Sequence, residues 1–146
     1  MVYIIISISY RLSKIHKKVK EQFSAPKSLE MGFVSSHIVV PNPATQKWQR
    51  IVTHTESQNP NDWKIAIIEA DSILDELVDS MGYRGETLGE KLKLIEQSDF
   101  TTINNAWEAH KVRNFIAHEA SFQLSEREAR RVIALYQSVL EEFKYI

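Results

Sequence analysis

The sequence predicts an all-α fold: an antiparallel up-and-down helical bundle of four to five helices with an N-terminal extension. Two observations lead to this prediction. The 146 residues include only four glycines and four prolines, which argues against a loop-rich or all-β fold. From residue 44 onward, apolar residues recur at spacings of three and four, the periodicity of helices that bury one face. The length is enough for one domain with a true core.

The composition narrows the class of protein further. Hydrophobic residues make up 43% and charged residues 25%, as in ordinary globular domains. The chain has no cysteine, which excludes disulfides and thiolate metal sites and fits a cytoplasmic location. The net charge of −1 is uneven, because residues 1–20 hold five basic residues and no acid. Positions 21–146 therefore have 13 basic and 19 acidic residues, unlike a general nucleic-acid binder.

Residues 1–24 form the predicted apolar and basic N-terminal extension. Val2–Tyr10 is too short to cross a bilayer as a helix, which needs about 20 residues. Its basic residues follow the apolar run, in contrast to a signal peptide. Two interpretations remain: a segment that packs on the body or on a second copy, which we favour, or the cut end of an anchor that tethers the chain to the inner face of a membrane. Residues 25–43 are a predicted linker, punctuated by Pro26, Gly32, Pro41 and Pro43.

The first two helices of the body, residues 44–146, have clear start signals. Asn42 caps the first, which ends near Ser57, and Asn59-Pro60 opens the second, which Gly82 stops. The second helix is the most clearly amphipathic. The face opposite its apolar stripe is predicted to be solvated, a reading we prefer to a metal site at Asp71 and Asp75. The acids of that face are Glu69, Asp71, Asp75, Glu76 and Asp79.

Three further helices follow. Thr87-x-x-Glu90 is a capping box for a short third helix, and Ser125-x-x-Glu128 is another for the last. Ser98 or Thr101 opens the fourth, whose apolar residues do not fall on one stripe. We therefore expect the fourth helix to make contacts on several sides, including with a second subunit. The fourth and last helices are predicted to be antiparallel neighbours.

The candidate site lies on the fourth helix, at Arg113, Asn114 and His118. Asn114 and His118 are four residues apart and share a face, and the long Arg113 side chain can reach toward it. A guanidinium offers a planar fork of donors to phosphate oxygens, and an imidazole can transfer a proton near neutral pH. This set therefore suits a phosphate ligand and needs no metal or cofactor.

The string from Val112 to Glu119, with Arg113-Asn114 and His118 at its centre, resembles the Arg-polar-x3-His signature of the HEPN superfamily (higher eukaryotes and prokaryotes nucleotide-binding domains). The pattern covers six residues, or seven with Glu119, within a helical region of about 85 residues. Members are small all-α domains, many of them dimeric, metal-independent ribonucleases. The resemblance implies that Arg113 binds the scissile phosphate, His118 acts as general base or acid, and Asn114 orients the histidine or holds an oxygen.

The same resemblance implies cleavage of RNA by attack of the ribose 2′-hydroxyl, at a composite site across a homodimer, in a toxin or defence effector. The alternative is a non-catalytic helical module that binds a nucleotide or a protein such as an antitoxin, tethered through its N-terminus. Structural roles also remain open, because Arg113 could pair with Glu119 or Asp99 and His118 could cap the helix end. His110 lies outside the family pattern and is predicted to be a bundle or interface histidine.

RNA binding would also need a local basic patch in an acidic body. The candidates are Lys111, Arg113, Arg127, Arg130 and Arg131, for which a solvated face is the alternative. No pair among His16, His37 and His54 has a convincing zinc spacing.

Overall fold

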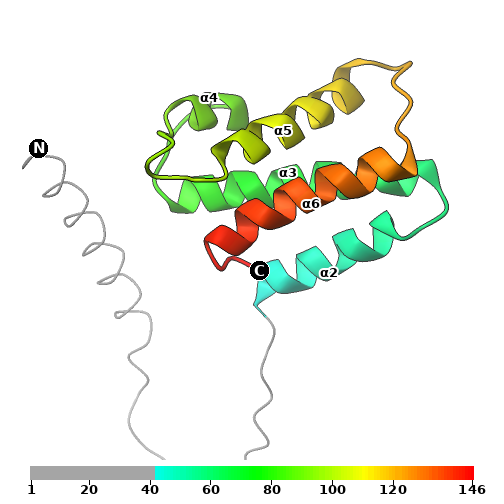
Figure 1. Cartoon of the computed structure of the whole chain (residues 1–146), viewed down its shortest axis with the longest axis horizontal. Coiled ribbons are helices and arrows are strands. Elements are labelled where there is room, and N and C mark those ends of the chain that lie inside the picture. The colour runs from blue at the N-terminus through cyan, green and yellow to red at the C-terminus, as the bar shows by residue number, and fades with distance from the viewer. Residues whose placement is uncertain (1–41) are drawn as a thin grey trace, which may run out of the picture. The chain divides into compact units, whose positions relative to one another are not determined.

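The computed structural model describes residues 42–146, which contain five helices and no strand (Figure 1). This confirms the predicted all-α fold. All five helices belong to one compact unit. The predictions for residues 1–24 and for the linker up to residue 41 lie outside the described residues. The helices are α2 (Pro43–Thr55), α3 (Pro60–Ser80), α4 (Leu88–Lys93), α5 (Ile103–His118) and α6 (Glu126–Glu142).

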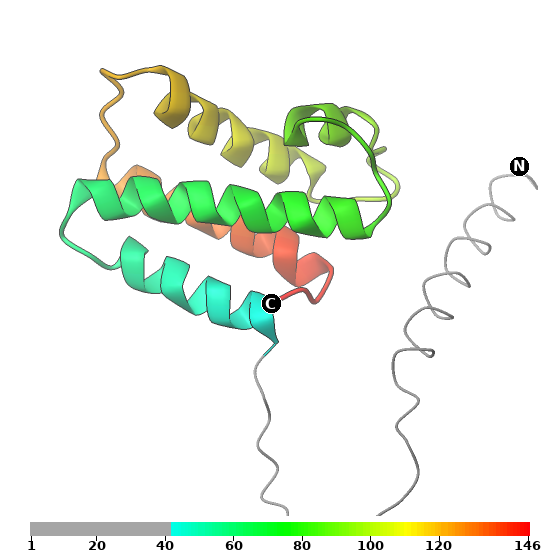
Figure 2. The ribbon, with the colours of Figure 1, turned by 180° about the vertical axis from the view of Figure 1, so that it is seen from behind.

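The four long helices run alternately up and down, as Figures 1 and 2 show. Helices α3 and α6 pack against each other in the middle, with α2 on one side and α5 on the other. The predicted contact between α5 and α6 is confirmed, and these helices are antiparallel. The short α4 packs on α3 and α5. The bundle therefore places three elements, α3, α4 and α5, around the same region.

Helix α3 is the centre of the core, since it contacts every other described helix. Its side chains of Ile67, Leu74 and Val78 are fully buried, together with Tyr136 and Leu140 of α6. Burying each such apolar side chain stabilises the fold by about 1.5–3 kcal/mol. Within residues 42–146, no helix combines the length and the apolar content needed to cross a membrane.

Local signals set most of the helix starts. Asn42 and Asn59 accept hydrogen bonds at α2 and α3 from the N–H groups of Ala44 (3.1 Å) and Asn61 (3.0 Å). Gly82, at φ 93°, ends α3 as predicted. In each capping box, one of the two expected hydrogen bonds forms. Thr87 and Ser125 accept from the N–H three residues on, but the Glu90 carboxylate turns to the Glu86 N–H and that of Glu128 to Arg131.

The start of α5 is not set locally, and the prediction of a cap at Ser98 or Thr101 is wrong. The cap position is Thr102, whose side chain makes no capping bond. Glu142, at the end of α6, supplies the acceptor instead. Its carboxylate accepts from the backbone N–H groups of Thr101 (2.9 Å) and Thr102 (3.0 Å) and from both hydroxyls. Partial burial raises the pKa of Glu142, but the hydrogen bonds from Thr102 and Thr101 outweigh this and lower it.

Candidate functional site

Helix α5 changes character along its length. Its first ten residues include five that are buried, whereas no residue from Arg113 to His118 is buried. The buried positions are Ile103, Ala106, Ala109, His110 and Val112. In this last part of the helix, His118 is exposed, and Arg113 and Asn114 are half-buried.

A cleft of about 900 Å³ lies between α3, α4 and α5, and Arg113, Asn114 and His118 all line it. The structure thus brings the three sequence-predicted site residues to one surface. His118, the last residue of α5, is exposed and makes no hydrogen bond or ion pair within residues 42–146. It does not cap the helix end, which was the structural alternative. The other lining residues include Asp71, Asp75, Gly89, Lys93, Trp107, His110 and Lys111.

Arg113 is anchored at one end and open at the other. Its Nε lies 3.3 Å from Asp71 Oδ2, so the ion partner is Asp71 and neither Glu119 nor Asp99. The Nε–H does not point at that oxygen, and Nε is buried without a hydrogen-bond partner. The contact is therefore a charge pair rather than an aligned hydrogen bond. Nη1 donates to Asn114 Oδ1 at 3.2 Å, and the side chain is 34% exposed.

Asp71 is the residue that sequence reasoning misplaced. It is only 6% exposed, so the prediction of a solvated face is wrong at this position. Its Oδ1 accepts from the Tyr136 hydroxyl at 2.9 Å and lies 2.8 Å from His110 Nδ1. A signal was available, because Asp71 stands four residues after Ile67 and three before Leu74, within the apolar stripe.

The buried polar network therefore joins three helices: Asp71 from α3, His110 and Arg113 from α5, and Tyr136 from α6. Burial, followed by the charge and the hydrogen bond of Asp71, raises the pKa of Tyr136 well above its ordinary value. The phenol thus stays a neutral donor. His110 is buried, which confirms that it is a bundle histidine, although it also faces the cleft.

The carboxylates around the cleft mostly have partners. Asp75 pairs at 2.8 Å with Lys91, which Asp79 also contacts at 2.8 Å, and Glu76 pairs with Lys47. Within the described residues, no group of three or more His, Asp or Glu side chains is placed to hold a metal ion. Two lysines of the lining make no ion pair within residues 42–146, and these are Lys93 and Lys111.

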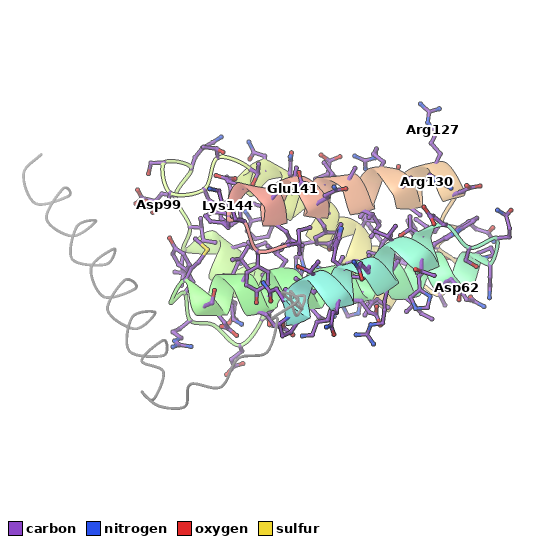
Figure 3. The ribbon with its side chains drawn as sticks, turned by 90° about the horizontal axis from the view of Figure 1, so that it is seen from below. Asp62, Asp99, Arg127, Arg130, Glu141 and Lys144 are labelled. Carbon is purple, nitrogen blue, oxygen red and sulfur yellow. The ribbon has the colours of Figure 1, made fainter. Side chains whose placement is uncertain are left out.

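The five candidate patch residues do not form one surface of free cations. Lys111 and Arg113 line the cleft. Arg130 pairs with Glu126, and Arg131 pairs with Glu128 and Glu108. Arg127 projects away from the bundle (Figure 3). The cationic side chains that line the cleft are therefore Arg113, Lys111 and Lys93.

The chemistry available in the cleft is phosphate binding beside an accessible imidazole. The outer nitrogens of Arg113 can donate to phosphate oxygens, and the imidazole of His118 can donate or accept a hydrogen bond. Comparison of the chain with protein-family models, with curated proteins and with solved structures finds no match.

Proposed function

We propose that this domain is a metal-independent endoribonuclease of the HEPN type. The observation that supports the proposal is that Arg113, Asn114 and His118 line one solvent-open cleft, in which His118 is exposed and Arg113 is held from behind by Asp71. This is the set of groups that phosphoryl transfer needs: a bidentate cation and a proton-transfer group.

In the proposed reaction, the ribose 2′-oxygen attacks the adjacent phosphorus and the bond from phosphorus to the 5′-oxygen breaks. The 2′-hydroxyl loses a proton to a base, and the departing 5′-oxygen receives one from an acid. His118 performs one transfer and His118 of a second copy performs the other, while Arg113 stabilises the charge on the phosphate oxygens. The products are a 2′,3′-cyclic phosphate and a free 5′-hydroxyl, so DNA would not be cut.

A composite site of this kind requires a second copy across a two-fold axis. Phe115 supports such a contact, because it is 52% exposed on the same half of α5 as His118. Its ring stacks on that of Phe122, with centroids 5.9 Å apart and planes 17° apart. The two rings leave apolar surface beside the cleft that a second copy would cover.

The central test is cleavage of varied RNAs in EDTA, with analysis of the end groups. Loss of a proton-transfer residue typically costs about 10²–10⁴-fold in rate, so His118→Ala should cut at least about 100 times more slowly. His54→Ala is the matched control, because His54 lies on α2 and away from the cleft. Equal cleavage by wild type and His118→Ala would rule the proposal out.

Arg113 needs a milder change, because removing it would leave the buried Asp71 carboxylate without its cation. Arg113→Lys keeps the charge and loses the bidentate fork, so we expect slower cleavage in an intact fold. Arg127→Ala removes a solvent-exposed arginine and should leave cleavage unchanged. If Arg113→Lys cuts at the wild-type rate, the guanidinium does not act on the phosphate.

The dimer has its own test. Phe115→Ser should shift the protein toward monomer in light scattering and lower cleavage at the same time. Leu94→Ser is the control, since Leu94 is 57% exposed at the end of α4 and outside the cleft. Full activity in a wild-type monomer would contradict a composite site.

A second candidate is a non-catalytic module that binds a nucleotide or a protein partner, such as an antitoxin, and is tethered through residues 1–24. The acidic rim favours it, because Asp75, Glu76, Glu86 and Glu90 all line the cleft and oppose a polyanion. If the wild-type protein binds nucleotides in this cleft but cuts no RNA, the non-catalytic module is the correct interpretation.

A further inference from the structure

We propose that His110 is a ligand-contacting residue, whose Nε2 accepts a hydrogen bond from the nucleoside part of a nucleotide through a gap that Gly89 leaves in α4. The proposal rests on the proposed function only for the class of ligand. It assigns to the cleft a second subsite, separate from the phosphate position at Arg113 and His118.

The first argument is the fixed orientation of the His110 ring. Nδ1 lies 2.8 Å from Asp71 Oδ1, and the same carboxylate is held by the Tyr136 hydroxyl and by the charge of Arg113. A carboxylate can only accept, so Nδ1 carries the hydrogen. In the neutral ring, Nε2 therefore presents a lone pair. A donor on a ligand would meet an acceptor whose direction is set before binding.

The second argument is that this acceptor has no partner in the protein. The His110 side chain is 9% exposed and lines the cleft, yet Nε2 makes no hydrogen bond within residues 42–146. Among the described side chains, the buried polar atom without a partner is Arg113 Nε, so solvent reaches His110 Nε2 through the cleft. A donor on a ligand in the cleft can therefore take the place of water at this acceptor.

The third argument is that the backbone conformation at Gly89 is open to any residue and does not require glycine. Among the described residues, only Gly82 and Lys144 have positive φ, so Gly89 adopts an ordinary helical backbone. Gly89 is the second residue of α4, and its backbone there does not require glycine. A Cβ at position 89 would lie 3.5 Å from His110 Nε2 and 3.9 Å from Thr87 Oγ1, which is ordinary contact. An alanine methyl would thus fit, and it would cover Nε2.

Distance separates this subsite from the proton transfer. His110 and His118 are eight residues apart, or about 12 Å along the helix at 1.5 Å per residue. Both imidazoles of one chain therefore do not act on the same phosphorus atom. A nucleotide whose phosphate lies at Arg113 and His118 extends its sugar and base along α5 toward His110. The donor is a ribose hydroxyl or an exocyclic amino group.

Gly89→Ala tests the proposal without disturbing the buried network. Binding is measured by calorimetry or by NMR with inorganic phosphate, adenosine 5′-phosphate, uridine 5′-phosphate and their 2′-deoxy forms. Wild type should bind at least one nucleotide more tightly than inorganic phosphate. One neutral hydrogen bond corresponds to about a 3- to 10-fold change in affinity, so Gly89→Ala should bind that nucleotide more weakly by this factor. The affinity of the Gly89→Ala protein for inorganic phosphate and its melting temperature should not fall.

A double-mutant cycle separates ligand contact from structural support. In His110→Asn, the amide can still donate to Asp71, but nothing replaces Nε2. If Nε2 is the contact, adding Gly89→Ala to His110→Asn causes no further loss of nucleotide affinity. If Gly89→Ala weakens binding of the ribose forms and leaves the 2′-deoxy forms unchanged, the donor is the ribose 2′-hydroxyl. If the weakening is confined to the adenosine nucleotides, with and without the 2′-hydroxyl, the donor is the exocyclic amino group.

Three results would overturn the inference: nucleotides binding no tighter than phosphate, an unchanged nucleotide affinity in Gly89→Ala, or equal weakening of phosphate and nucleotides. None of these readouts uses cleavage. If the protein binds nucleotides in the expected way but cuts no RNA, the His110 subsite stands and the ribonuclease proposal fails. If it cuts RNA but does not show the expected binding, the ribonuclease proposal stands and the His110 subsite fails.

Discussion

The two halves of α5 differ in what holds them. Five of the residues 103–112 are buried on the side that packs against α3, α4 and α6, and the buried polar one among them, His110, is fixed by Asp71. Residues 113–118 have no buried position, and His118 has no protein partner within the described chain. The first half acts as part of the core and the second half presents side chains. The packing of the first half positions the groups that the second half presents.

The largest effect is expected from Asp71→Ala, which removes the common partner of His110, Tyr136 and Arg113. Breaking a buried charge pair by deleting one partner costs about 3–5 kcal/mol, and we expect a loss of that size in the free energy of unfolding. Denaturant unfolding measures it. Glu69→Ala on the same helix should cost less than about 0.5 kcal/mol. Similar values for the two variants would mean that the network does not hold α5.

Tyr136→Phe should have the next largest effect. It removes one hydrogen bond to a charged carboxylate, which is worth about 1.5–3 kcal/mol. The pKa of Tyr136 is raised in the fold, so the folded state keeps the phenolic proton after the unfolded chain has lost it. This stabilisation is complete below the ordinary tyrosine pKa of about 10 and is lost as pH rises toward the folded value. The stability difference between wild type and variant should therefore shrink as pH rises above about 10.

Glu142→Ala tests the start of the first half. Loss of the carboxylate that caps Thr101 and Thr102 should cost about 0.5–2 kcal/mol at neutral pH. Because the pKa of Glu142 is lowered in the fold, its contribution is present above the ordinary carboxyl value of about 4.3 and is lost as pH falls through the folded pKa. The variant and wild type should thus converge in acid. Glu141→Ala, one residue earlier and exposed (Figure 3), is the control.

His118→Ala should have the smallest effect on stability, within about 0.5 kcal/mol, because an exposed side chain without partners is removed. The same variant is expected to lose cleavage, so stability and activity should separate at this residue. Thermal melting of the variant provides the measurement. A loss above about 2 kcal/mol would place His118 with the core half of the helix and contradict the comparison.

The fold was predictable where its signals are local. The helix ends at Asn42, Asn59 and Gly82 are set by hydrogen bonds with residues two or three positions away. The cap of α5 was not predictable, because Glu142 is 40 residues from Thr102 and no local pattern connects them. Nor did the sequence reveal that the capping-box carboxylates of Glu90 and Glu128 have other partners.

The candidate site was predictable as a set of residues on one helix and not as a cleft. Helical spacing alone indicated that Asn114 and His118 share a surface. The opposite walls come from α3 and α4, whose packing depends on the whole bundle. Asp71 shows the limit most clearly: a carboxylate within an apolar stripe was assigned to solvent, because its partners are 39 and 65 residues away.

The position of Trp107 gives the cleft an intrinsic optical probe. Its indole lines the cleft and meets the His110 ring edge-on, with centroids 6.4 Å apart, whereas Trp48 and Trp63 are packed in the core. Indole emission depends on the polarity of its surroundings, so filling the cleft would alter the fluorescence of one tryptophan out of three. Occupancy could then be followed in unlabelled protein, on the millisecond scale of stopped-flow mixing.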